Sequence, residues 1–172
     1  MAYYGLTDTV MGSMLVGVEG DRLIAVKFNV DERNLARAVE ELHRETHGAF
    51  GLERSEAKVR PFAKQLRDYL AGKRTTFDVK MDLSFVTPFR RAVLEECSRI
   101  PRGQTTTYAE LARRVGRPNA YRAVGHTMAT NPIPIVIPCH RVVASSGNLQ
   151  GFGGGLDMKL KLLTLEGVAL QV

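Results

Sequence analysis

IPIVIPCHRVV, residues 133–143, is the stretch that decides how the second half of this chain is interpreted. An extended apolar segment runs into Cys139, and His140 and Arg141 follow it. A cysteine is nucleophilic as its thiolate, which forms only where a neighbouring group takes the proton or stabilises the charge. Adjacent residues of a strand point to opposite faces, so His140 must reach Cys139 through irregular backbone or through a water. The stretch therefore predicts a reactive thiol with a base beside it.

The composition is that of an ordinary globular protein, with 172 residues of which 44% are hydrophobic and 24% charged. This length suits one large domain or two small ones. No apolar run approaches the roughly 20 residues of a membrane span, and residues 1–18 lack the basic start and apolar core of a signal peptide. Two cysteines, Cys97 and Cys139, are too few for a disulfide framework. We therefore expect a cytoplasmic protein of prokaryotic type with a free thiol and no membrane partner.

Positive charge gathers in the second half of the chain. Residues 1–80 carry 13 Lys and Arg against 12 Asp and Glu, whereas residues 81–172 carry 11 against 6. Within residues 99–141 the only acid is Glu110, and the basic residues are Arg99, Arg102, Arg113, Arg114, Arg117, Arg122 and Arg141. Arginine clusters suit planar contacts with phosphate. The cluster indicates a nucleic-acid surface, with an ordinary solvated surface as the alternative.

Hydrophobic patterning predicts a small α/β unit in the first 82 residues. Two apolar-rich runs, Ser13–Val18 and Arg22–Asn29, flank a short turn and predict strands. Amphipathic patterns predict helices over Asn34–His47 and Glu56–Ala71. The alternation over Thr75–Met81 predicts a further strand. Nothing in this portion indicates catalysis.

His43 and His47 lie four residues apart on the first of these helices, a spacing that can bind a metal. No third ligand is evident, so we expect both on the solvated surface of the helix. We therefore predict no metal site.

The second half begins with a capped helix. Thr87 is a favoured N-cap, and Pro88 suits the first helical position. One stripe of this helix, at positions 89, 93, 97 and 100, is apolar apart from a cysteine. We therefore expect Cys97 to be a small core residue rather than a second nucleophile.

Two short helices follow in close succession. Thr107 and Glu110 form the pattern of a capping box at the start of the first, which stops at Gly116. Asn119 is the expected cap of the second, over Ala120–Ala129. Such a pair is typical of a helix-turn-helix, but it also occurs in proteins that never contact DNA. Its coincidence with the arginine cluster favours DNA binding.

The second helix of this pair carries small residues at Ala120, Ala123, Gly125 and Ala129. A slim helix can lie close to a nucleic-acid groove or, equally, to another helix. Closely spaced glycines after Cys139 allow the backbone to approach a flat ligand. A last helix, predicted over Asp157–Glu166, ends in a carboxylate that can orient His140 in a set of nucleophile, base and orienting acid.

The chain resembles the O6-alkylguanine–DNA alkyltransferases, the methylated-DNA–protein-cysteine methyltransferases. The residues that carry the resemblance are Tyr108, Arg122, Asn131-Pro132, Pro138-Cys139-His140-Arg141-Val142 and Glu166-Gly167. The resemblance covers residues 84–172, and the content of residues 1–82 agrees with it. It implies an α+β protein: a small N-terminal α/β domain over 1–82, with an antiparallel sheet and helices of ribonuclease H type, and a mostly helical C-terminal domain over 83–172 with a winged helix-turn-helix.

The resemblance implies DNA repair by one irreversible transfer of an alkyl group from O6-alkylguanine in double-stranded DNA to Cys139. This is a single-turnover methylated-DNA–protein-cysteine S-methyltransferase reaction that uses no cofactor. His140 would take the thiol proton through a water, Glu166 would hold His140, and Asn131 would support the turn that presents the thiol. O4-alkylthymine stays open as a second substrate.

The resemblance also implies that the damaged base leaves the duplex through the minor groove. Arg122 would fill the space that the base leaves, and Tyr108 would push the neighbouring phosphate and donate to the flipped base. The other residues of the implied DNA surface are Arg117, Ala120, Tyr121, Ala123 and Gly125. The implied substrate pocket consists of Pro134, Val142, Phe152 and Gly153, with the carbonyls of Cys139 and Val142 reading the guanine amine.

Three features depart from the pattern of the family. Gly153 stands where some relatives have serine, so an oxygen of the lesion would be met by backbone N–H alone. Tyr121 and His126 are bulkier than the residues that relatives often carry on the recognition helix, which bears on minor-groove fit and lesion preference. No cysteine precedes Cys97, so we do not expect the N-terminal zinc of some relatives.

Two other functions stay open on the residues alone. A related binding module would hold the flipped base without reacting, but such proteins lack the cysteine that is kept here at Cys139. A cysteine hydrolase would use Cys139, His140 and Glu166 as a triad and would leave the arginines unexplained. We expect a monomer in solution and leave cooperative loading on DNA open.

Overall fold

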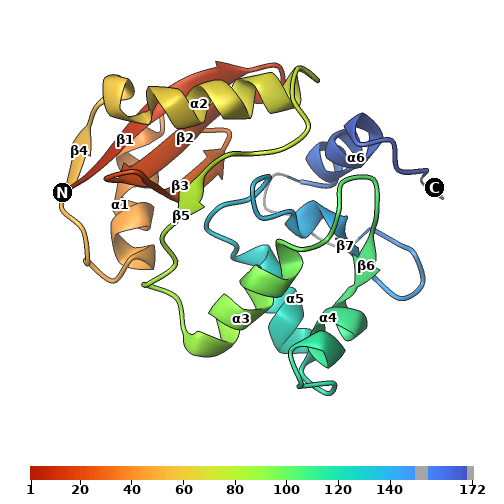
Figure 1. The fold of residues 1–172 in the computed structure, drawn as a ribbon. Coiled ribbons are helices and arrows are strands. Elements are labelled where there is room, and N and C mark those ends of the chain that lie inside the picture. Colours follow the sequence, from red (N-terminus) through yellow and green to blue (C-terminus); the bar gives the residue numbers. More distant parts are fainter. Residues whose placement is uncertain (150–154, 170–172) are drawn as a thin grey trace. The chain divides into compact units, whose positions relative to one another are not determined.

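The structure is a computed structural model, which describes residues 1–149 and 155–169. The chain forms two compact units, Met1–Val86 and Thr87–Val172. The first contains a five-stranded sheet with helices, and the second is mostly helical (Figure 1). This is the α+β fold class that the sequence predicts. No helix in the described part of the chain combines the length and apolar character that a membrane crossing requires.

The sheet of the first unit has the strand order β4-β1-β2-β3-β5. Its strands are β1 (Ala2–Thr9), β2 (Gly12–Glu19), β3 (Arg22–Phe28), β4 (Leu52–Arg54) and β5 (Lys80–Met81). The three central strands are antiparallel, as expected of the sheet, but the sequence predicts only β2 and β3 of them and not β1. The edge strands β4 and β5 pair in parallel, because each follows a connection that carries the chain back to the same end of the sheet.

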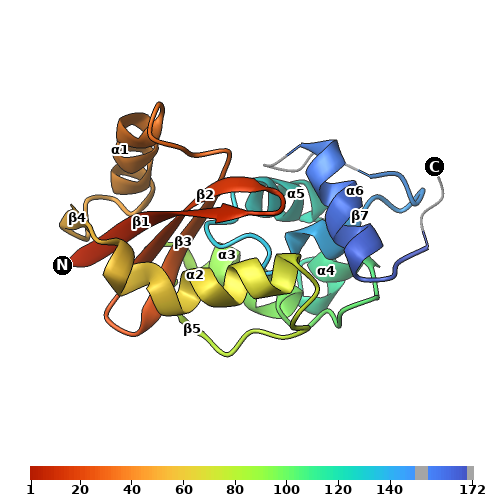
Figure 2. The ribbon, with the colours of Figure 1, turned by 90° about the horizontal axis from the view of Figure 1, so that it is seen from above.

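The two helices predicted in this unit are confirmed as α1 (Leu35–Glu45) and α2 (Glu56–Leu70). They cover opposite faces of the sheet (Figure 2). α1 places its apolar stripe in a buried cluster with residues of the first three strands. The N-cap of α2 is Ser55, whose side chain accepts a backbone N–H of the first turn. It lies so close to β1 that a Cβ added at Gly5 would be 2.8 Å from Val59.

The strand predicted over Thr75–Met81 is wrong except for its last two residues. Gln65 in α2 donates to the backbone carbonyl of Asp78 at 3.0 Å and accepts its N–H at 2.9 Å. These bonds hold the backbone of Asp78 against the helix, away from any strand ladder. Only Lys80–Met81 therefore pairs with β3.

The second unit consists of short helices and one small strand pair. Its elements are α3 (Pro88–Cys97), β6 (Thr106–Thr107), α4 (Tyr108–Arg114), α5 (Tyr121–Ala129), the 3₁₀ helix η1 (Cys139–Arg141), β7 (Val142–Val143) and α6 (Leu156–Leu165). β6 and β7 pair in parallel. Cys97 is buried on the inner face of α3, as predicted for a core residue.

The predicted caps of α3 and α4 are confirmed. The Thr87 hydroxyl accepts a backbone N–H of α3, and the Thr107 hydroxyl accepts the N–H of Glu110 in α4. The carboxylate of Glu110 does not complete a capping box, since it pairs instead with Arg113 and Arg114. The arginines one turn further along the helix thus compete successfully for it.

The predicted cap of α5 is wrong by one residue. Ala120, not Asn119, is the N-cap, and it makes no side-chain capping bond. The Ala120 N–H donates to the Arg117 carbonyl at 2.9 Å, so a turn occupies the residues where the helix was expected to start. α5 therefore begins at Tyr121.

Candidate active site

The loop that presents Cys139 closes on itself. The Ile137 N–H donates to the Ile133 carbonyl at 2.9 Å, and Ile135 has a φ of 74°, which is unusual for a β-branched residue. The N–H of Arg141 then donates to the Pro138 carbonyl at 2.9 Å and forms the single turn η1. The prediction of an extended segment running into the cysteine is therefore wrong, and irregular backbone places Cys139 beside its neighbours.

Asn131 bridges this loop and contacts the thiol. Its side chain accepts the N–H of Ile133 at 3.0 Å and donates to the carbonyl of Ile137 at 2.9 Å. It also forms a hydrogen bond with Cys139, whose exposed fraction is only 4%. One amide thus fixes both the shape of the loop and the surroundings of the sulfur.

Burial has the largest influence on the pKa of the Cys139 thiol. It raises the pKa of Cys139 to about 11, while the bond from Asn131, the charge of Lys159 and backbone N–H groups act in the opposite direction. The sulfur is therefore a neutral thiol at pH 7. It becomes a nucleophile only if a base removes its proton.

His140, Glu166 and Arg141 form a buried polar cluster. His140 Nε2 lies 3.0 Å from Glu166 Oε2. Arg141 donates to both oxygens of the same carboxylate, at 2.9 Å and 2.8 Å, and to the Ile100 carbonyl at 2.7 Å. Residues 26 positions apart thereby meet. Planar, two-fold bonding of this kind fixes the orientation of the carboxylate.

The imidazole of this cluster is held neutral. Burial lowers the pKa of His140, and the hydrogen bond to Glu166 only partly opposes this effect. With Nε2 facing the carboxylate, Nδ1 is the ring nitrogen suited to accept a proton. A neutral histidine that follows a buried cysteine in the chain is a candidate general base for its thiol.

Lys159 is a site residue that the sequence did not indicate. It lies in α6 with an exposed fraction of 1%, and its ammonium donates to the Val142 carbonyl at 2.8 Å. Burial lowers its pKa to about 8, and the charge of Cys139 acts against that shift. A lysine in an amphipathic helix is usually solvated, so no feature of the sequence pattern marks this one as buried.

A cavity of about 420 Å³ lies beside the helix pair, lined by Tyr108, Tyr121, Gly125, Ala129 and Ser145 among others. It brings together three of the predicted DNA-contacting residues. Burial, and then the charge of Cys139, raise the pKa of the Tyr108 phenol. Tyr108 thus lines the cavity and also lies close enough to Cys139 for a charge on the sulfur to affect the pKa of its phenol.

The other predicted residues comprise buried pocket residues, small residues at the start of α5, and residues outside the described part of the chain. Pro134 and Val142 are buried. The carbonyls of Cys139 and Val142 already accept bonds, from the Val142 N–H and from Lys159 respectively, which leaves each a second lone pair. Ala120 is half-buried, and Ala123 is exposed. Phe152 and Gly153 lie outside the described residues.

The arginine cluster divides into members that bond to a group of the protein and members that form no ion pair with a described residue. The acceptors are Glu96 for Arg99, the Leu165 carbonyl for Arg102, Glu110 for Arg113 and Arg114, and Glu166 for Arg141. Arg117 and Arg122 are exposed, and neither forms an ion pair with a residue that the structure describes. Charge counting alone therefore overstated the surface available to phosphate.

The described residues offer no group of three or more His, Cys, Asp or Glu side chains that could hold a metal ion. His43 and His47 in particular have no third ligand among them.

The chain belongs to the 6-O-methylguanine DNA methyltransferase family. The family's ribonuclease-like domain matches residues 2–83, and its DNA-binding domain matches residues 88–168. A methylated-DNA–protein-cysteine methyltransferase of Methanosarcina acetivorans is 36% identical over 96% of this chain and 98% of its own length. The one of Mycolicibacterium paratuberculosis is 50% identical over 60% of this chain, and the match spans 62% of that relative's length.

Two solved structures are similar over nearly the whole chain. One is Mycobacterium tuberculosis OGT in complex with DNA, which has 33% identity and a TM-score of 0.80, and covers 95% of this chain and 92% of its own. The other is the O6-methylguanine-DNA methyltransferase of Pyrococcus kodakaraensis, with 27% identity, a TM-score of 0.72 and coverage of 98% and 100%. The family resemblance read from residues 84–172 is thereby confirmed.

Proposed function

We propose that this protein repairs DNA by transferring an alkyl group from O6-alkylguanine in a duplex to the sulfur of its own Cys139. The observation that carries the proposal is a buried Cys139 thiol bonded by Asn131, followed in the chain by a neutral histidine whose ring faces Glu166. The names of the relatives, and the complex of the M. tuberculosis neighbour with DNA, support the same reaction class.

The thiol is activated when the substrate is in place. His140 Nδ1 takes the thiol proton, directly or through a water, and the Glu166 carboxylate stabilises the imidazolium that forms. Lys159 adds positive charge near the sulfur. Because the resting thiol has a pKa of about 11, little thiolate exists before this transfer.

The transfer itself is a displacement at carbon. The thiolate attacks the alkyl carbon, an S–C bond forms, and the C–O6 bond breaks with its electron pair going to the base. The guanine anion then takes a proton, for which we assign the Tyr108 hydroxyl as donor. The tyrosinate regains a proton from solvent, and His140 returns the thiol proton to solvent. The product is a thioether, which is a poor leaving group. Each molecule therefore acts once, and no cofactor is required.

The damaged base must leave the stack before the sulfur can reach it, at a cost of a few kcal/mol. We assign Arg122 to the space that the base leaves and Arg117 to the phosphates, since both are exposed and bind no described acid. Ala120, Ala123 and Gly125 let α5 lie close to the minor groove, with Tyr121 at its start. Pro134, Val142, Phe152 and Gly153 are assigned to the pocket.

We assign the chemistry to residues 83–172 and a scaffolding role to residues 1–82. The protein acts as a monomer in the cytoplasm, and its partner is double-stranded DNA that carries the lesion. The family membership and the absence of a membrane-spanning helix in the described residues are compatible with this assignment.

The proposal is tested by incubating the protein with a duplex that holds one O6-methylguanine, followed by digestion and mass spectrometry. We expect one methyl group on the peptide that contains Cys139, and a yield that stops at one per protein molecule. Cys139→Ala should bind the duplex and transfer nothing. Cys97→Ala is the matched control, since it removes the chain's other cysteine and should leave transfer intact.

Each alternative function predicts a different result. A yield that rises beyond one methyl per protein would indicate a turning-over hydrolase. Intact lesions in bound duplex would indicate a binding module. Methyl transfer that survives Cys139→Ala would remove the basis of the proposal.

A further inference from the structure

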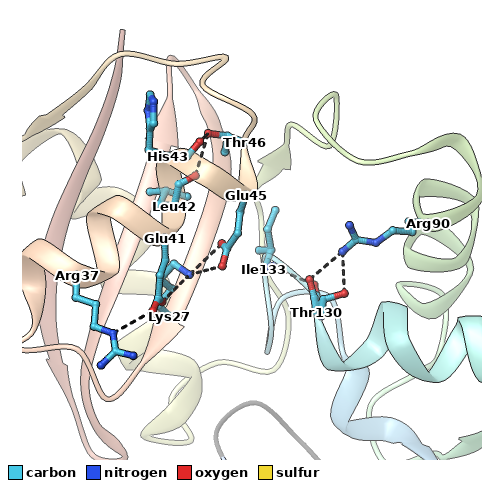
Figure 3. A network of polar contacts seen from close by, with 11 residues as sticks. Lys27, Arg37, Glu41, Leu42, His43, Glu45, Thr46, Arg90, Thr130 and Ile133 are labelled. Carbon is cyan, nitrogen blue, oxygen red and sulfur yellow. Dashed lines mark hydrogen bonds and ion pairs between the residues drawn. The ribbon is translucent and has the colours of Figure 1, made fainter.

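Arg90 connects the first turn of α3 to the end of α5. Its guanidinium Nη2 donates to the Thr130 carbonyl at 3.1 Å and to the Thr130 hydroxyl at 2.9 Å (Figure 3). That hydroxyl in turn donates to the His126 carbonyl inside α5 at 2.8 Å. A cation at the C-terminus of a helix is also favoured by the helix dipole. Arg90 therefore fixes the last turn of α5.

The last turn of α5 leads directly to the thiol. Thr130 is the C-cap of the helix, and the next residue is Asn131. Asn131 bridges the loop from Ile133 to Ile137 and bonds the sulfur of Cys139. A shift of Thr130 is therefore passed to the amide that holds the thiol. The opposite end of the contact is anchored, because α3 is capped by Thr87.

We propose that Arg90 is a positioning residue for Cys139 and acts through Thr130 and Asn131. The inference rests on the proposed function. Arg90 ties α3 to Thr130, the residue at which α5 ends and the loop toward the sulfur begins, so it sets the geometry of attack rather than the affinity for DNA. Misplacement of a reacting group by about 1 Å can slow a reaction by roughly 100-fold.

The test compares the transfer rate constants of wild type and Arg90→Ala at saturating substrate. We expect a loss of about tenfold, within the range that misplacement of a reacting group allows. The loss should be equal for the methylated duplex and for free O6-methylguanine, because it arises at the thiol. The dissociation constant for the duplex should stay unchanged. Arg90→Gln keeps a neutral donor for Thr130 and should recover most of the rate.

A pH profile separates positioning from a purely structural role. The bond from Asn131 lowers the pKa of the Cys139 thiol. If Arg90→Ala weakens that bond, the rise of the transfer rate with pH should move to higher pH. Partial unfolding would lower the rate at every pH by the same factor. Thermal unfolding of each variant measures the folded fraction directly.

Arg91→Ala is the matched control, since Arg91 lies one residue further along α3 and pairs at the surface with Glu95 at 3.0 Å. It should transfer at the wild-type rate. The inference is overturned if Arg90→Ala also transfers at that rate, if its loss equals its unfolded fraction with an unchanged pH profile, or if Arg90→Gln recovers nothing. A wild-type protein that transfers no methyl group overturns the proposed function itself.

Discussion

The two units of this protein use charged side chains in opposite ways. In residues 1–86 ion pairs lie at the surface, as in Lys27 with Glu45 at 2.9 Å (Figure 3). In the second unit Arg141, Lys159 and Glu166 are buried together with the neutral His140, and no other charged side chain among the described residues is buried. An exposed pair contributes at most about 1 kcal/mol, whereas removing one partner of a buried pair costs about 3–5 kcal/mol.

This contrast separates stability from chemistry. The first unit rests on an apolar cluster between the sheet and α1, and its charges keep the surface solvated. The second unit removes charged groups from water, and this desolvation costs free energy. Apolar residues of the same volume would fill the space without that cost. The charges that it buries are the ones beside the thiol, so the cost is concentrated where the reaction needs fixed polar groups.

The largest expected effect comes from Glu166→Gln. The change leaves Arg141 with a buried charge that is no longer balanced, and it weakens the hold on His140. We expect the free energy of unfolding to fall by about 3–5 kcal/mol and the transfer rate of the folded protein by roughly 100-fold. Denaturant unfolding measures the free energy of unfolding, and single-turnover assays measure the transfer rate.

The surface pair provides the control for Glu166→Gln. Glu45→Gln removes the exposed partner of Lys27 in the first unit. It should change the free energy of unfolding by less than about 1 kcal/mol and leave transfer unchanged. Similar losses for both variants would contradict the difference between the units.

Arg122→Ala tests an exposed charge of the second unit. We expect slower repair of a methylated duplex by about tenfold, because the cost of extruding the base is no longer offset. Transfer from free O6-methylguanine should be unaffected, since no extrusion is needed. The measurement is the rate ratio for the two substrates. Arg37→Ala, which removes an exposed arginine of the first unit, should leave that ratio unchanged. Equal slowing of both substrates by Arg122→Ala would exclude the extrusion role.

The effect of Lys159→Met on stability is expected to depend on pH. Burial lowers the pKa of Lys159 to about 8, from 10.5 in the unfolded chain. Between these values the unfolded state binds more protons, so the contribution of Lys159 to the free energy of unfolding rises with pH. Wild type should therefore gain stability relative to Lys159→Met as the pH rises above about 8. Denaturant unfolding of both proteins at several pH values checks this, and a difference that is constant with pH would contradict it.

Local patterns predicted the helices of this protein well. Ser55, Thr87 and Thr107 are caps that act over three residues, and all three are confirmed. Predictions failed where a side chain distant in the sequence forms hydrogen bonds with backbone groups, as Gln65 does with the backbone of Asp78. The short strand β4 was not predicted either, because its three residues carry too little pattern.

The site could be predicted only in part. The motif around Cys139 singled out the thiol, the histidine and the distant Glu166 as candidates, because the family resemblance supplies their order along the chain, and the structure brings His140 and Glu166 together. It gave no indication of Lys159 or of the contact from Arg90 to Thr130. Both depend on which side chains the folded helices bring together, and neither has a pattern at fixed spacing.

The sequence by itself determined the fold class and the family and singled out Cys139 as the candidate nucleophile, because helical periodicity, caps and a short motif act over a few residues. Only the tertiary structure decided that this thiol is buried with a pKa near 11, that its histidine is neutral, and that five of seven nearby arginines bond within the protein. The burial of a side chain and its bonding partners depend on residues far apart in the chain, so they are determined only once the chain has folded.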